Sequence, residues 1–245
     1  MILDISDPNN PRKISQIEAP FGKGIYVKGS HAYIACYGSG LRVIDVSDPE
    51  NPREVGHLEI GAWAQDIHVQ GDYAYIADDS GGLVIVDVSD PANPSKVANI
   101  SGTDSHGIFV SENYAYLADG ISQKLKIVDV TDPRNPRLIK EVRHSYNSAQ
   151  GVYVLGDYAY VAYDGWYSGG AAGLGIIDVS DPDRAEVVGS VRISWAKRVY
   201  VSGGYAYVAD EKDGLVIVDV SDPENPQIVS KLSGMKLYEV FGKEE

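Results

Sequence analysis

Short runs of alternating apolar and polar residues recur along the whole chain, and each run is closed by glycine, asparagine or aspartate. Residues 64–100 show the unit, with runs at 66–70, 73–77, 83–88 and 95–100. A period of two over five or six residues predicts a β-strand. No stretch shows a sustained helical period. The pattern therefore predicts an all-β protein built from four-stranded units, whose strands we call A to D.

The unit is copied along the chain with a nearly constant period. The phrase Asp-(Val/Ile)-(Ser/Thr)-Asp-Pro closes strand C six times, starting at Asp4, Asp45, Asp87, Asp129, Asp178 and Asp219. The starts are 41, 42, 42, 49 and 41 residues apart. Periods in this range are typical of solenoids and propellers, and four short strands per repeat are typical of a propeller blade.

Strand C itself carries a recurring sequence motif. It reads Leu83-Val-Ile-Val-Asp87 and Leu215-Val-Ile-Val-Asp219, and three other units carry close variants. This wording resembles the LVIVD repeat family, whose members are regarded as β-propellers and occur in many bacterial and archaeal surface proteins. The resemblance covers essentially the whole chain. It implies a propeller with an extracellular or cell-surface location and implies little about activity.

We therefore predict one domain, residues 1–245, forming a six-bladed β-propeller with four-stranded antiparallel blades. Five units are complete, at about residues 22–60, 64–100, 105–142, 149–193 and 196–233. The closing blade would combine strands C and D from residues 1–19 with a strand A from residues 235–245. It lacks a recognisable strand B. Strand A would then pair directly with strand C, or a partner chain or further residues of this chain would fill the gap.

Composition narrows the classes of partner. The formal net charge of -14 argues against nucleic-acid binding, because that affinity comes largely from lysine and arginine on phosphates. No apolar run is long enough to span a bilayer, and the first residues lack the features of a signal peptide. Cys36 is the only cysteine, so no internal disulfide can form. The oligomeric state stays open.

The differences between units fall on one face. Loops joining D to A and B to C vary, whereas the C–D loops are nearly uniform, and variable loops on a rigid frame are where binding residues tend to lie. Both variable sets surround one mouth of a propeller channel. Residues entering strand A there form a polar ring of Lys23, Gln65, His106, Gln150, Lys197 and Lys236. The next position adds Asp66 and Arg198.

Aromatic residues map to the same mouth. Trp63 and Trp195 lie two positions before the ring, where the third unit has Asp104, and the longest B–C loop contains Trp166 and Tyr167. Aromatic plates with amide and basic donors would suit a sugar or an acidic small molecule. The alternative is that the tryptophans pack under neighbouring loops and the cations are solvated and paired with acids.

Catalytic and metal signals are weaker. His106 with Asp104 or Asp66 could form an oriented base, but no nucleophile is marked beside it. Zinc-ligand spacing is absent, and the loop oxygens that would suit calcium lack the acid spacing of a dedicated site. No catalytic residue, metal ligand or cofactor is therefore predicted.

The sequence favours a non-catalytic binding or surface interaction module. Its ligand would be a small molecule, glycan or protein at the channel mouth. Two alternatives remain open. One is a propeller hydrolase of the lactonase or esterase type with its site at the same mouth, and the other is a structural part of a larger envelope protein.

Overall fold

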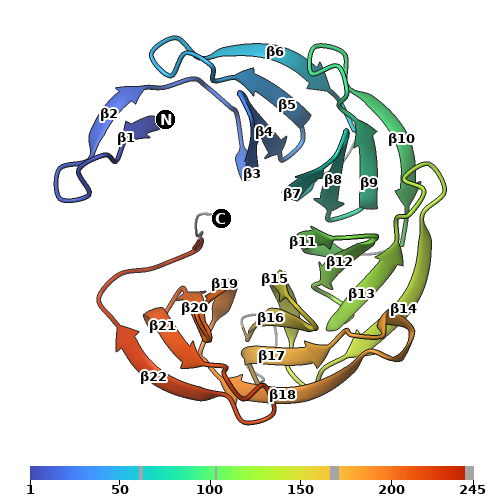
Figure 1. Ribbon diagram of the computed structural model, residues 1–245, viewed down its shortest axis with the longest axis vertical. Helices are drawn as coiled ribbons and strands as arrows, with labels where there is room; N and C mark the ends of the chain where they lie inside the picture. The colour runs from blue at the N-terminus through green and yellow to red at the C-terminus, as the bar shows by residue number, and fades with distance from the viewer. Residues whose placement is uncertain (61–62, 103, 166–170, 241–245) are drawn as a thin grey trace.

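The computed structural model describes residues 1–60, 63–102, 104–165 and 171–240. Five four-stranded antiparallel sheets stand side by side around a central axis, and an N-terminal two-stranded sheet lies beside the first of them (Figure 1). The predicted all-β propeller architecture is confirmed. Among the described residues, no helix is long and apolar enough to cross a membrane.

Each complete blade contains four strands in chain order, with strand A innermost (Figure 1). The first blade contains β3 Gly22–Lys28, β4 His31–Cys36, β5 Gly40–Asp45 and β6 Arg53–Leu58. The second contains β7 Ala64–Gln70, β8 Tyr73–Asp78, β9 Gly82–Asp87 and β10 Ser95–Ile100. The third contains β11 Ser105–Ser111, β12 Tyr114–Asp119, β13 Lys124–Asp129 and β14 Arg137–Arg143. The fourth contains β15 Ser148–Leu155, β16 Tyr158–Asp164, β17 Gly173–Asp178 and β18 Glu186–Arg192, and the fifth contains β19 Ala196–Ser202, β20 Tyr205–Asp210, β21 Gly214–Asp219 and β22 Gln227–Leu232.

The repeated Asp-Pro phrase builds the turn between strands C and D. In the second blade, the Asp87 carboxylate accepts the N–H and hydroxyl of Ser89, while Asp90 accepts the side-chain amide of Asn93. Equivalent bonds recur in the other blades, and at Asp45 hydrogen bonds from Ser47 lower the pKa to about 2. Asparagine and aspartate are favoured in turns because they form such local bonds. These acids therefore serve the scaffold.

Neighbouring blades interlock through these turns. A Cβ atom on Gly56 of β6 would lie 2.0 Å from the Pro91 carbonyl oxygen of the next blade's C–D turn. The same close approach joins Gly189 to Pro223. Glycine is needed at these strand-D positions because only backbone fits there.

The N-terminal sheet makes the equivalent contact with the first complete blade. It consists of β1 Ile2–Asp4 and β2 Arg12–Ser15, paired antiparallel. The Ser15 hydroxyl donates to the Pro49 carbonyl at 2.6 Å. The sheet therefore lies where strands C and D of a preceding blade would lie.

The C-terminal segment differs from the prediction. Residues 235–240 form no strand, so the predicted strand A is wrong for these residues, and the chain instead runs to the middle of the ring (Figure 1). Lys236 and Tyr238 contact Glu211 at 3.7 and 3.2 Å, and the Leu237 N–H donates to the Asp210 carbonyl. Polar contacts with the fifth blade hold the segment.

The core lies between the blades. Leucines of strand C at positions 41, 83, 125 and 174 are fully buried, and so is the alanine at one register of every strand B: Ala35, Ala77, Ala118, Ala162 and Ala209. The face of β3 that carries Ile25, which we call its outward face, is not buried in this way. Ile25 is 46 % exposed, whereas Ile67 at the same register of β7 is 3 % exposed. Burial by a preceding blade is what distinguishes them.

This pair provides a test of blade packing. We expect Ile67→Ala to lower the free energy of unfolding by about 2–5 kcal/mol, because it leaves a cavity between two blades. The same change at Ile25 should lower it by less than about 1 kcal/mol, as for a surface position. Chemical denaturation of both variants measures the difference. Equal losses would mean that the outward face of β3 is covered in solution.

Candidate functional site

The innermost strands approach one another most closely at a single register. A Cβ atom on Gly24, Gly107 or Gly151 would lie 2.6–2.7 Å from backbone atoms of the next strand A. Only glycine fits there without displacing the neighbour. In β7 and β19 the same register holds Asp66 and Arg198, each opposite the buried alanine of strand B. Asp66 and Arg198 are thus the charged residues at this register of strand A.

Arg198 crosses the channel at this level. Its Nη1 donates to the Gln150 carbonyl at 2.7 Å and its Nη2 to the His106 carbonyl at 3.4 Å. Its guanidinium also lies 3.7 Å from Asp66 Oδ2 and 3.3 Å from Glu239 Oε2 of the C-terminal segment. The rigid fork of guanidinium donors suits such a set of oxygen acceptors. One cation thus ties together two carboxylates and the strands that carry Gln150 and His106.

Burial perturbs both carboxylates. It raises the pKa of Asp66, although Arg198 and the backbone N–H groups of Ile108 and Ile67 oppose the shift. Burial also raises the pKa of Glu239 to about 7, with Arg198 opposing and the Asp66 charge adding to the effect. Glu239 is therefore close to half protonated near neutral pH, which makes its contact with Arg198 easy to release.

Two residues further along each strand A, a set of aromatic side chains lines the channel. Its members are Tyr26, His68, Phe109, Tyr153 and Tyr200, with successive ring centroids 4.7, 4.9, 4.8 and 5.2 Å apart. We call this set the aromatic girdle. Burial lowers the pKa of His68 to about 4, so its ring is neutral at pH 7. The sequence analysis did not identify the girdle, although its members share one register of strand A when the units are aligned.

The girdle lines a cavity. A space of about 650 Å³ extends from Asp66 and Arg198 past the aromatic rings and is bounded on one side by Val240. A second hollow of about 590 Å³ lies against the girdle and the A–B turns, including Gly156 and Gly203. The cavity combines an apolar wall with one arginine, which is the usual composition of a small-molecule site.

The predicted polar ring is divided into separate pairs. Lys197 donates to Asp164 at 2.5 Å and lies 3.4 Å from Glu211. Gln150 donates to the Ser148 hydroxyl at 2.7 Å, and Lys23 lies 5.9 Å from the ring centre of Tyr37. Acids at the rim thus neutralise a basic residue that the sequence counted as a ligand donor.

The tryptophans are held by their own neighbours. Trp63 stacks on Tyr37 with centroids 5.6 Å apart, and its side chain is still 48 % exposed. Trp195 is half-buried, and its backbone N–H donates to the Asp210 carboxylate at 2.6 Å. Trp166 and Tyr167 lie outside the described residues.

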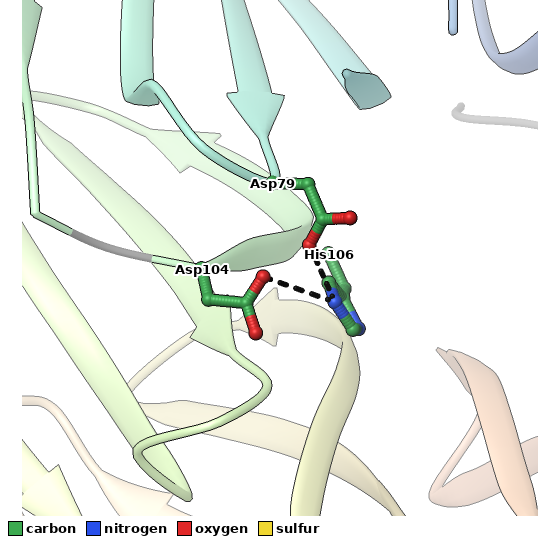
Figure 2. A group of neighbouring side chains, drawn as sticks. All are labelled: Asp79, Asp104 and His106. Atoms are coloured by element: carbon green, nitrogen blue, oxygen red, sulfur yellow. Dashed lines mark hydrogen bonds and ion pairs between the residues drawn. The ribbon is translucent and has the colours of Figure 1, made fainter. Parts of the chain in front are cut away.

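Asp104 and His106 come together as predicted, with a partner that sequence analysis missed. His106 Nε2 lies 3.0 Å from Asp79 Oδ1 and 3.5 Å from Asp104 Oδ1 (Figure 2). Gln65 also joins, donating to Asp79 Oδ2 at 3.2 Å. Burial and the neighbouring Asp79 raise the pKa of Asp104 to about 6. We call Asp79, Asp104 and His106 the rim cluster.

Asp79 could have been found from the repeat. It follows the strand-B residue that pairs with Ala64, and the equivalent positions in successive units are Tyr37, Asp79, Gly120, Asp164 and Glu211. The residue at this position varies as strongly as the polar ring does. Aligning it would have identified Asp79 and Glu211 as rim acids.

The repeats themselves settle the family. Residues 22–59, 61–101, 102–143, 147–192 and 195–233 each match the LVIVD repeat. The chain belongs to the LVIVD repeat family. No curated protein sequence matches this LVIVD chain.

Solved structures agree on the fold. A putative 6-phosphogluconolactonase from Bacteroides fragilis is 15 % identical with a TM-score of 0.72, covering 87 % of this chain and 70 % of its own. The periplasmic gluconolactonase of Pseudomonas aeruginosa is 14 % identical with a TM-score of 0.66, covering 85 % and 68 %. The β-propeller domain of Swd1 from Myceliophteria thermophila is also 14 % identical with a TM-score of 0.66, covering 85 % and 70 %. At such low identity the likeness shows the fold alone.

The C-terminal segment offers a pH test of this geometry. Docking raises the pKa of Glu239 from 4.5 to about 7, so docking takes up a proton. The segment should therefore dock most tightly below pH 4.5, loosen as the pH rises to about 7, and change little above that. The fluorescence anisotropy of a dye on Met235→Cys measures docking, since Cys36 is buried. Glu239→Gln should abolish this pH dependence, and an unchanged curve in that variant would refute the assignment.

Proposed function

We propose that this LVIVD chain is a binding module that takes a small carboxylate-bearing molecule into its channel. The acid group would lie on Arg198 and the apolar part of the ligand along the aromatic girdle. The observation that carries this proposal is the position of Glu239, whose carboxylate lies 3.3 Å from the arginine. In the resting protein the chain's own carboxylate occupies the place of the ligand's.

The cavity has the size and chemistry for such a ligand. Its volume of about 650 Å³ falls within the usual range for small-molecule sites. Tyrosine and phenylalanine rings supply apolar contact, and arginine binds carboxylates through short, charge-assisted hydrogen bonds. A neutral ligand would leave the guanidinium with Asp66 as its carboxylate partner and with the Gln150 and His106 carbonyls once Glu239 had been displaced. The site therefore favours an anion.

Ligand binding and docking of the C-terminal segment would compete. Val240 borders the cavity and Glu239 contacts the arginine, so an incoming acid must replace both contacts. The segment is an internal competitor that lowers the apparent affinity. Because Glu239 is close to half protonated near neutral pH, its contact with Arg198 is released at little cost in free energy. The site therefore stays accessible to the ligand at this pH.

Calorimetric titration with 3-phenylpropanoate and with its primary amide tests the proposal. We expect the acid to bind at least tenfold more tightly than the amide, because a hydrogen bond to a charged group contributes about 1.5–3 kcal/mol. Arg198→Gln should remove this preference. Lys231→Gln, which removes an exposed cation from the outer strand β22, should leave it unchanged. Equal binding of acid and amide by the wild type would refute the proposal.

Glu239→Gln tests whether the segment is an internal competitor. Because the segment docks more tightly when Glu239 is uncharged, the neutral glutamine should hold it in the channel near neutral pH, and we expect 3-phenylpropanoate to bind several-fold more weakly. Titration of the wild type and variant at one pH near neutral measures the ratio. Unchanged or tighter binding in the variant would show that the docked segment does not compete with the ligand.

The channel mouth with Trp63 and Trp195 is the other place where this module could hold a ligand. Trp63 keeps an exposed ring face against which a sugar or a protein side chain can pack. Titration with a glycan panel tests the mouth. Binding that is lost in Trp63→Ala or Trp195→Ala but retained in Arg198→Gln would assign the ligand to the mouth.

A hydrolase is the second candidate function, and the His106–Asp79 contact favours it. An imidazole held by a carboxylate is an oriented general base. A lactone and ester screen tests this candidate, with His106→Gln as the control. Turnover by the wild type that disappears in the variant would support it, and turnover that is unchanged would place the chemistry elsewhere.

We place the module at the cell surface, as the family resemblance implies. The strong negative charge is compatible with a soluble module presented outside the cell. Fractionation of the native organism, with detection of this chain in the envelope or the medium, tests the location. Finding it only in the cytoplasm would contradict this part of the proposal.

A further inference from the structure

We propose that the rim cluster binds a divalent first-row transition metal such as zinc, cobalt or manganese. Asp79 Oδ1, Asp104 Oδ1 and His106 Nε2 would be its protein ligands. One possible ligand atom from each of the three side chains lies within 4.8 Å of the other two. The inference does not rest on carboxylate binding in the channel, since the ligand atoms belong to different side chains.

The two carboxylates are oriented in the same way. In each, Oδ2 is held by the scaffold, with Gln65 donating to Asp79 and the Ile121 N–H donating to Asp104. In each, Oδ1 is the atom that faces His106 Nε2 (Figure 2). Hydrogen bonds that fix one oxygen of a carboxylate and aim the other are the outer shell expected around a metal ligand.

The spacing of the ligand atoms fits a transition metal. The oxygens of Asp79 and Asp104 lie 3.0 and 3.5 Å from the histidine nitrogen. With metal–ligand bonds of about 2.0–2.2 Å, adjacent ligand atoms lie about 3.0 Å apart in an octahedron and about 3.4 Å apart in a tetrahedron. A metal would take the place of the hydrogen bond between His106 Nε2 and Asp79 Oδ1, and it would offset the repulsion between the two carboxylates.

Two segments, the end of β8 and the start of β11, bring these groups together. Asp79 follows β8, Asp104 precedes β11, and His106 belongs to β11. A Cβ atom on Gly120 would lie 2.7 Å from the His106 ring, so the missing side chain at this position makes room for the imidazole. The side chains of Asp79, Asp104 and His106 are 16–21 % exposed, which leaves a path for an ion and positions for water ligands.

The donor set indicates the class of ion. Calcium takes six to eight oxygen ligands and magnesium usually keeps several waters, so neither needs an imidazole. One imidazole with two carboxylates suits zinc, cobalt and manganese, and three protein ligands leave a coordination position open. The cluster is thus an open site.

Metal titration of the full chain without an affinity tag tests the inference. Cobalt absorption and calorimetry with zinc, manganese and calcium should show one transition-metal ion per chain, with calcium at least tenfold weaker. His106→Gln and Asp104→Asn should each weaken binding at least tenfold. Gly120→Ala should also weaken it, although it removes no ligand, because the added methyl displaces the imidazole.

His57→Gln is the matched control. His57 lies on strand β6, where its Nε2 contacts the Ser39 carbonyl, so this variant also loses one imidazole and should bind metal like the wild type. Circular dichroism establishes that the variants fold, and the melting temperature of the wild type should rise with zinc. Absence of one-to-one binding, equal binding by His106→Gln, or equal affinity for calcium would overturn the inference.

Discussion

The close approach of neighbouring A strands is the constraint on which the rest of this molecule depends. At one register the strands leave room only for backbone, and glycine meets that demand at Gly24, Gly107 and Gly151. A side chain at this level must therefore extend into the channel. Asp66 and Arg198 do so, and because they are charged they place an ion pair at the level where the A strands approach one another. The same packing that joins the blades thus divides the channel into a polar mouth and an aromatic chamber.

Repetition and variation have different physical roles in this chain. The Asp-Pro turns recur because the C–D connections all need the same local hydrogen bonds to their backbone groups. The turns also interlock adjacent blades. Positions that break the repeat are free of that demand. The rim cluster and the channel arginine both lie at such positions, and each depends on a glycine elsewhere in the repeat for its space. The scaffold makes room for these side chains because the neighbouring positions hold glycine, which has no side chain.

The sequence was sufficient for the architecture because each blade repeats the same alternation and turn chemistry. It also brought Asp104 and His106 to one mouth by register alone. Asp79 was missed because the alignment stopped at the recurring aspartate before it. Lys197 was counted as a ligand donor because its acidic partners, Asp164 of the preceding unit and Glu211 of its own, lie well separated from it along the chain. The C-terminal segment was misjudged for another reason. Whether a strand forms depends on a neighbouring edge, which the segment's own residues do not encode.

The uncovered outward face of β3 also bears on how the described blades share their stability. In a closed ring every blade has two neighbours, whereas here the complete blades form an arc in which end blades have fewer contacts. Such an array behaves approximately as a one-dimensional chain of intrinsic and nearest-neighbour terms. Local unfolding should then begin in the first and fifth complete blades, at the ends of the arc, and reach the third blade last. That blade carries Asp104 and His106, so the rim cluster lies where cooperative protection is greatest.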